Sequence, residues 1–221
     1  MGINNEVEFH QETLPRKTKK ALDFLSTRTW LTKKSWYLAG GTALALQAGN
    51  RKSVDLDFFT TQANLKVLSH FRKNKNWETD LNTENTIFGK LFKAKVSFIA
   101  YPFFIPKQDY IKYGTINILQ ARDIEVMKII AISQRGKKRD FFDLYWCAHN
   151  VEPLEDIIKR LPAQYPSVAH DYHHILKSLV YFEDAESDPE PEIFFEASWK
   201  MVKRFFTKEI PIITRKVMKL N

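Results

Sequence analysis

The sequence predicts an α+β protein, in which residues 1–120 form a small mixed β-sheet with helices and residues 121–221 form a helical C-terminal half. Short apolar runs punctuated by proline and glycine, typical of strands, are confined to the first half. After Gln120 the apolar residues recur at the three- and four-residue spacings of helices. A hydrophobic content of 44% over 221 residues supports one large domain or two small ones.

The first half is predicted to open with a basic amphipathic helix over residues 14–26, with Leu22, Phe24 and Leu25 on its apolar side. A strand, a helix and a second strand follow at 36–39, 42–47 and 54–59. We then expect a helix over 64–75 and strands over 77–81, 86–92, 95–101 and 115–119.

The second half is predicted to be almost wholly helical. Gly136 separates its first two helices, and prolines interrupt the later ones. The expected helices cover residues 122–134, 139–149, 154–161, 170–181 and 193–206, with a short closing stretch over 212–218. The domain boundary is placed near Gln120, and we expect the helical domain to complete an active cleft.

Two carboxylates stand two residues apart in a β-rich run, Asp55 and Asp57. Because side chains alternate faces along a strand, Ser53 shares their face. The residues between them are expected to face a core: Val54, Leu56 and Phe58. Two carboxylates on a rigid strand suit Mg²⁺, which is bound in proteins by one or two carboxylates together with substrate phosphate oxygens.

A Gly-Gly-Thr turn precedes this strand and opens a helical pattern. Gly40 and Gly41 let the backbone approach a phosphate closely, and a helix N-terminus favours anions. Thr42 is either a further phosphate contact or a helix N-cap. Ser53 either donates a hydrogen bond to a phosphate or is simply a polar strand end.

The loop between these motifs carries Arg51 and Lys52. Either cation could hold a triphosphate or an RNA backbone, and both could equally be solvated loop charges. A glycine turn that can bind phosphates, next to a pair of carboxylates that can bind a metal ion, indicates that the protein handles a nucleoside triphosphate.

In the helical half, Lys128 falls on the same helical face as Ile124 and Ala131. A lysine on an apolar face needs an anionic partner or a route to water. A bound triphosphate is one possible partner; a snorkelling side chain is the structural alternative.

A basic tract and two acids follow. Asp140 and Asp143 are three residues apart and so neighbour each other on a helix. Ordinary pairing of Arg139 with Asp143 is one interpretation, and a catalytic or acceptor-orienting role for Asp143 is the other. Lys137, Lys138 and Arg139 are candidate contacts for an acceptor RNA. The acidic segment 183–188 is a solvated linker, a partner of the basic tract or a docking site for another protein.

These motifs resemble the nucleotidyltransferase superfamily, whose signature is a Gly-Gly or Gly-Ser turn followed by an Asp-x-Asp strand. The resemblance is strongest to the AbiEii/AbiGii-type nucleotidyltransferase toxins, including MenT-like toxins, of bacterial abortive-infection and toxin–antitoxin systems. It rests on four segments between Gly40 and Pro191: AGGTALAL, RKSVDLDFF, KIIAISQRGKKRDFFDLYW and YFEDAESDPEP.

The resemblance implies a nucleotidyltransferase-type sheet and particular roles for several residues. Lys128 matches a lysine that contacts the nucleotide in such toxins. The pattern Arg-Asp-x-x-Asp-Leu-Tyr fits residues 139–145 and favours Asp143 over Asp140. A cognate antitoxin and acceptors such as tRNA 3′ ends are further implications.

One departure from the superfamily pattern concerns a third carboxylate, which often lies on a later strand. The corresponding run here, residues 95–101 around Ser97, contains no acid. The role of the third carboxylate would then pass to an acid in the helical half or to the acceptor itself.

Together these observations predict a Mg²⁺-dependent nucleotidyltransferase that moves a nucleoside monophosphate from an NTP to an acceptor and releases pyrophosphate. The net charge of +8 suits RNA. A transferase for small molecules, as in drug resistance, and a degenerate fold that only binds nucleic acid or a partner are the alternatives. The single cysteine excludes an intrachain disulfide, and no apolar run is long enough to span a bilayer, so we expect a cytoplasmic protein. The sequence leaves open the nucleotide, the acceptor and the oligomeric state.

Overall fold

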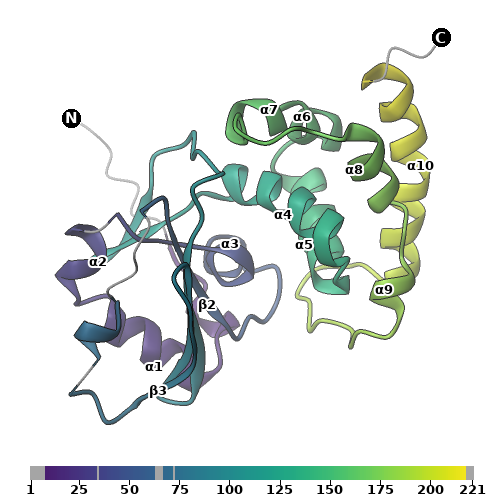
Figure 1. Cartoon of the computed structure of the whole chain (residues 1–221). Coiled ribbons are helices and arrows are strands. Elements are labelled where there is room, and N and C mark those ends of the chain that lie inside the picture. Colours follow the sequence, from purple (N-terminus) through teal and green to yellow (C-terminus); the bar gives the residue numbers. More distant parts are fainter. Residues whose placement is uncertain (1–7, 34, 63–66, 72, 218–221) are drawn as a thin grey trace, which may run out of the picture. The chain divides into compact units, whose positions relative to one another are not determined.

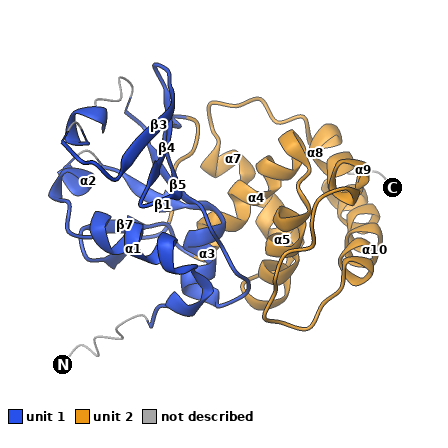
Figure 2. Ribbon diagram, turned by 90° about the horizontal axis from the view of Figure 1, so that it is seen from below, with its two compact units in different colours: residues 1–102, 108–120 blue, residues 103–107, 121–221 orange. Residues whose placement is uncertain are grey.

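The computed structural model describes residues 8–33, 35–62, 67–71 and 73–217 (Figure 1). Contacts divide the chain into two compact units (Figure 2). Unit 1 comprises residues 1–102 and 108–120, and unit 2 comprises residues 103–107 and 121–221.

Unit 1 is built on a mixed sheet, which in the described residues has seven strands in the order β3-β4-β5-β2-β1-β7-β6. Strand β2 lies between antiparallel β1 and parallel β5. The strands are β1 (Tyr37–Ala39), β2 (Leu56–Thr60), β3 (Trp77–Asn82), β4 (Thr86–Leu91), β5 (Ala94–Ala100), β6 (Ile111–Tyr113) and β7 (Ile116–Ile118). The helices are η1 (Gln11–Thr13), α1 (Arg16–Leu25), α2 (Thr29–Lys33), α3 (Gly40–Ala48) and η2 (Val67–His70).

Aromatic packing fixes the middle of this sheet. Phe98 of β5 is fully buried and stacks on Phe58 of β2, with ring centroids 5.3 Å apart. Three tryptophans and a further phenylalanine also contact the Phe98 ring: Trp30, Trp36, Trp77 and Phe71. The position of β2, which carries Asp57, is therefore set by a large apolar cluster.

Helix α1 forms as predicted, and the residues of its apolar side differ in burial. Leu22 and Leu25 are buried, whereas Phe24 is half-exposed. Phe24 lies at the edge of the buried stripe on the apolar side of α1, where it packs on the ring of Phe92.

Two further predictions about unit 1 need correction, and two short elements were missed. Val54 is 42% exposed and does not face the core, because β2 begins only at Leu56 and the expected alternation does not extend back to it. The helix predicted over 64–75 is reduced, within the described residues, to the 3₁₀ turn η2; residues 63–66 and 72 lie outside the described part. The short elements β6 and α2 were not predicted.

Unit 2 is helical, as predicted. Its helices are α4 (Ala121–Arg135), α5 (Lys138–Asn150), α6 (Leu154–Lys159), α7 (Leu161–Gln164), α8 (Tyr172–Ser178), α9 (Glu183–Glu186) and α10 (Trp199–Val217). None of the helices in the described residues combines the length and the apolar character needed to cross a membrane.

The last helix differs from its prediction. The two stretches expected over 193–206 and 212–218 are one helix, α10, which begins at Trp199 and has Pro211 inside it. Proline removes one intrahelical hydrogen bond. An apolar stripe along α10 is buried on both sides of the proline and keeps the helix continuous: Val202, Phe206, Ile210 and Ile213.

A buried acid on α4 is a feature that the sequence did not reveal. Glu125 is fully buried, and its carboxyl group contacts the guanidinium of Arg160, which also forms an ion pair with Glu152. Burial, followed by the hydrogen bond to Glu152, raises the pKa of Glu125 to about 10. Burial opposes ionisation of Glu152 as well, but the hydrogen bond from Glu125 and the charges of Arg160 and Arg122 lower its pKa. Glu125 is therefore the protonated member of the pair at neutral pH.

We expect Glu125→Gln to stabilise the protein increasingly as the pH rises. A raised pKa means that the folded state binds the proton more tightly, so this contribution is complete below about pH 4.5 and is lost as the pH rises toward 10. Glutamine keeps the neutral hydrogen-bonding form, and its advantage should amount to several kcal/mol by pH 8. Urea unfolding between pH 5 and pH 9 measures the difference.

Glu155→Gln on α6 is the matched control. Hydrogen bonds from Lys159 and then Lys216 lower the pKa of Glu155, so it stays ionised throughout this range. A stability difference between wild type and Glu125→Gln that does not change with pH would contradict the assignment.

Candidate active site

The predicted glycine turn joins β1 to α3. Gly40 has φ +70°, a left-handed conformation that glycine adopts without strain. A Cβ on Gly40 would lie 3.4 Å from Asp57 Oδ2, and a Cβ on Gly41 would lie 2.2 Å from Arg51 Nη2. The absence of a side chain at Gly41 therefore lets a guanidinium lie against the start of α3, and a carboxylate oxygen of Asp57 lies beside Gly40.

Thr42 connects this turn to the segment before β2. Its hydroxyl lies 2.8 Å from Ser53 Oγ and donates a hydrogen bond to the backbone carbonyl of Asp55. The N-cap of α3 is Ala39, so the interpretation of Thr42 as the N-cap was wrong. Its hydroxyl instead holds the Asp55 backbone beside the first turn of α3.

Arg51 is buried, with 4% of its surface exposed, so it is not a solvated loop charge. Its Nη1 donates to the Lys52 carbonyl at 2.9 Å, while the side chain of Lys52 itself is exposed. A guanidinium held against Gly41, at the N-terminal end of α3, adds positive charge where the helix dipole already favours anions.

The two predicted metal ligands lie at the start of β2. Asp55 directly precedes the strand and Asp57 lies within it, and both are half-buried. Their oxygen donors fit Mg²⁺, which binds proteins through one or two carboxylates and completes its shell with water and substrate phosphates.

The neighbouring strand places no acid beside Asp57. In the register of parallel β5 on β2, Ser97 lies next to Asp57. Within the part of the chain that the structure describes, no three or more His, Cys, Asp or Glu side chains gather into a metal site. The donor set therefore fits an ion that takes its remaining ligands from a substrate.

A second set of predicted residues meets inside unit 2. Lys128 of α4 is buried, and its Nζ lies 2.7 Å from Asp140 Oδ1 and 2.7 Å from Asp143 Oδ2, both on α5. The snorkelling interpretation of Lys128 was therefore wrong. The anionic partners that its position requires are two carboxylates with no exposed surface.

Arg135 completes this cluster from the end of α4. Its guanidinium lies 2.9 Å from Asp140 Oδ2 and is half-exposed. Burial alone would raise the pKa of Asp140, but the charges of Lys128 and Arg135 together lower it. Two cations and two carboxylates thus form a neutral unit, from which Arg135 reaches the surface.

The basic tract that was predicted to bind an acceptor contacts the acidic segment 183–188. Lys137 Nζ lies 3.0 Å from Asp188 Oδ1. Lys138 is buried and donates from its backbone N to Asp188 Oδ2 at 3.0 Å, and from Nζ to the Asp188 carbonyl at 2.8 Å. Pairing of the two segments, one of the predicted alternatives, is confirmed, and Arg139 remains exposed.

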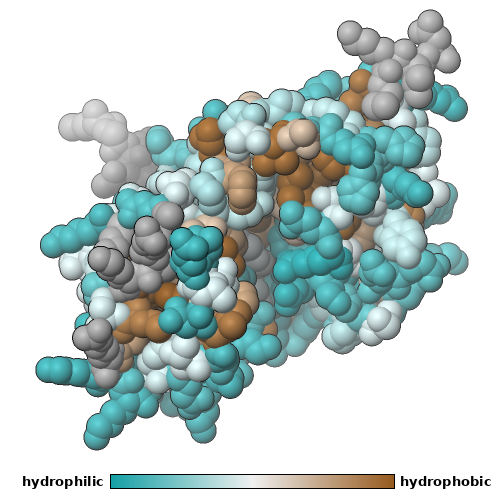
Figure 3. Space-filling model, in the orientation of Figure 1, coloured by the Kyte–Doolittle hydropathy of each residue, from teal (hydrophilic) through white to brown (hydrophobic). Residues whose placement is uncertain are grey.

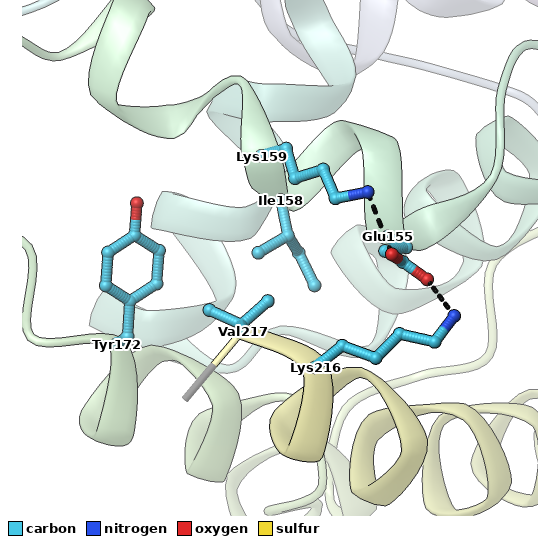
Figure 4. Close-up of a pocket in the computed structure, with 6 residues that line it drawn as sticks. All are labelled: Glu155, Ile158, Lys159, Tyr172, Lys216 and Val217. Atoms are coloured by element: carbon cyan, nitrogen blue, oxygen red, sulfur yellow. Dashed lines mark hydrogen bonds and ion pairs between the residues drawn. The ribbon is translucent and has the colours of Figure 1, made fainter. Parts of the chain in front are cut away.

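A cavity of about 440 Å³ lies elsewhere in unit 2, and none of the predicted site residues lines it (Figure 4). Glu155 of α6 bridges Lys159 at 2.8 Å and Lys216 of α10 at 2.6 Å, as Figure 4 shows. Ile158, Tyr172 and Val217 complete the lining. We interpret the Glu155 carboxylate as a structural ion-pair contact that links α6 to α10.

Comparison with known proteins now identifies the family. The sequence model of a family described as "Nucleotidyl transferase AbiEii toxin, Type IV TA system" matches residues 31–118 and 102–214. The chain belongs to this family. An uncharacterized protein of Aquifex aeolicus (strain VF5) is 33% identical over 185 residues, which cover 79% of this chain and 86% of that protein.

Solved structures share the fold of this AbiEii family member. MenT4, a nucleotidyltransferase toxin of Mycobacterium tuberculosis H37Rv, superposes with a TM-score of 0.54 at 16% identity, covering 89% of this chain and 86% of MenT4. JHP933 of Helicobacter pylori gives a TM-score of 0.50 at 18% identity, covering 93% and 95% of the two chains. The predicted resemblance and fold class are therefore confirmed.

The two glycines of the turn should respond differently to alanine. Gly40→Ala should cost roughly 1–2 kcal/mol, because its left-handed backbone is strained for any L-residue. Gly41 has no such conformation, but a Cβ there would lie 2.2 Å from Nη2 of the buried Arg51, so Gly41→Ala should displace that guanidinium. Urea unfolding measures the stability of each variant, and an unchanged stability of Gly40→Ala would contradict the assigned strain.

Lys128→Met should destabilise the protein by about 3–5 kcal/mol at pH 7, because it leaves two buried carboxylates without their ammonium partner. The loss should shrink as the pH falls toward 4, since protonation neutralises a buried acid that has lost its cation. Urea unfolding at several pH values measures both effects. Lys177→Met on the exposed side of α8 is the control and should lie within about 0.5 kcal/mol of wild type.

Proposed function

We propose that this AbiEii family member is a Mg²⁺-dependent nucleotidyltransferase that moves a nucleoside monophosphate from an NTP to a hydroxyl of an RNA, with tRNA as the favoured acceptor. The observation that carries the proposal is the meeting of Gly40, Gly41, Arg51 and Asp57 at the start of α3. A phosphate-sized anion and a hard cation are the ligands that this combination of groups suits.

In the proposed reaction, the acceptor oxygen forms a bond to the α-phosphorus of the NTP while the bond from that phosphorus to the β-phosphate oxygen breaks. Pyrophosphate leaves, and the hydroxyl proton passes to a base. Mg²⁺ held by Asp55 and Asp57 would neutralise phosphate charge and orient the triphosphate. Arg51, Ser53, Thr42 and the first amides of α3 are proposed to contact the phosphates.

Lys128 and Asp143 receive the remaining proposed roles. The carboxylates of Asp140 and Asp143 fix the Lys128 ammonium in one position, so a contact from it to a phosphate would be preorganised. The resemblance suggests a part for Asp143 in handling the acceptor, but its carboxylate has no exposed surface and pairs with Lys128, so we propose that it acts by fixing Lys128.

The proposed partners follow from charge and family. A net charge of +8 favours an RNA acceptor over the cationic small molecules that a resistance-type transferase would modify. The family description places its members in type IV toxin–antitoxin systems, which implies an antitoxin partner. We propose that the protein acts in the cytoplasm, where NTPs and tRNA are found.

Asp55→Asn and Asp57→Asn test the reaction. Each should reduce transfer of label from α-phosphate-labelled NTPs to total bacterial RNA by at least about 100-fold, since a lost metal ligand costs several kcal/mol of transition-state stabilisation. Asp80→Asn on exposed β3 is the matched control and should transfer normally.

Each of the four NTPs is assayed with Mg²⁺ and with EDTA, and label is followed in RNA, protein and small-molecule fractions. Label that appears in a small-molecule fraction would identify the resistance-type alternative. NTP binding without turnover in any fraction would identify a degenerate, non-catalytic fold. Near-normal transfer by both asparagine variants would refute the metal assignment.

A further inference from the structure

A second cationic surface lies on unit 1, on residues to which the proposed reaction gives no role. Lys17, Lys20, Phe24 and Arg28 follow one another at spacings of three and four residues, which places them along one side of α1 and the turn after it. Arg28 covers the Phe24 ring, with Cζ 4.0 Å from its centroid. We call this row, with Phe92 and Lys93, the α1 stripe.

The hairpin turn between β4 and β5 supplies the rest of the stripe. Phe92 and Lys93 have φ +52° and +66°, so both are left-handed, as in the two-residue turns that match strand twist. Neither is glycine, and each costs roughly 1–2 kcal/mol in this conformation. Contacts with α1 offset the strain: the Phe92 ring packs edge-on to Phe24 at 5.5 Å, and Lys20 Nζ lies 4.6 Å from the Phe92 centroid.

The four cations of the stripe have no compensating acids. Among the described residues, none of these four cations forms an ion pair: Lys17, Lys20, Arg28 and Lys93. Lys137 of unit 2, in contrast, pairs with Asp188. The adjacent acid on α1 is Asp23, and its carboxylate accepts a hydrogen bond from Tyr113 Oη at 2.6 Å. Figure 3 shows hydrophilic side chains covering much of the face of the molecule that it presents.

We propose that the α1 stripe binds the phosphate backbone of the acceptor RNA. The proposal rests on the proposed function for its choice of ligand. Four positive charges without partners, the first two one helical turn apart, complement the closely spaced charges of a nucleic acid backbone. The rings of Phe24 and Phe92 pack on each other, and Arg28 and Lys20 lie over them. Because these rings do not form an exposed apolar face, the arrangement argues against insertion into a membrane.

The test is a salt series with the full chain and a fluorescently labelled tRNA, measured by anisotropy without NTP. The variant Lys17→Ala/Lys20→Ala/Lys93→Ala should bind at least tenfold more weakly near 0.1 M salt. The slope of log K against log salt should flatten by about 2–3, since each phosphate contact contributes about 0.7–0.9. The control Lys33→Ala/Lys75→Ala/Lys200→Ala removes the same charge from other exposed positions and should keep the wild-type slope.

Steady-state transfer separates this proposal from the proposed function. If the reaction exists and the stripe binds the acceptor, the stripe variant raises KM for RNA and leaves KM for NTP unchanged. Stripe-dependent RNA binding without any transfer of label would defeat the proposed function and leave the stripe proposal standing. Equal losses in the two triple variants, or binding to anionic vesicles that depends on the stripe while RNA binding does not, would overturn the stripe proposal.

Discussion

The helical unit is organised around one buried ammonium group, the Nζ of Lys128, which lies 2.7 Å from each of two fully buried carboxylates. Removing charges from water costs several kcal/mol for each ion unless geometry and partners are nearly ideal. Lys128 and Arg135 balance Asp140 and Asp143, so the cluster is neutral. Because the two cations come from α4 and the two acids from α5, the pairing fixes the register of these helices, and an arrangement that broke it would leave a charge buried alone.

Unit 1 depends on a different constraint, the close approach of side chains to a bare backbone. Gly41 leaves room for the Arg51 guanidinium at the start of α3, and Asp57 lies beside the left-handed Gly40. The aromatic packing of Phe98 on Phe58 holds β2, and with it the Asp57 backbone, in place. Apolar packing and glycine geometry thus place a half-buried carboxylate and a buried guanidinium where a helix dipole favours anions. Groups fixed in this way need little reorganisation when a ligand arrives.

The basic residues of the chain fall into classes with different physical roles. Lys128 and Arg51 are buried, and their charge acts in a poorly screened environment. Lys138 is also buried, but it holds the acidic segment through Asp188 and so belongs to the architecture of unit 2. Lys17 and Lys93 are exposed, and their effect is an electrostatic field that salt screens. A net charge of +8 alone does not distinguish these classes, although each predicts a different response to mutation and ionic strength.

The sequence by itself determined the fold class, most strand and helix positions and the family, because periodicity and the Gly-Gly and Asp-x-Asp motifs are local patterns. It also placed Lys128 and Asp143 among the residues of interest. Only the tertiary structure decided which charges are buried together, such as Lys128 with Asp140 and Asp143 or Glu125 beside Arg160, and that Phe24 packs on Phe92. These facts depend on contacts between elements far apart in the chain, and the free energy of burying a charge is set by the partners that packing supplies.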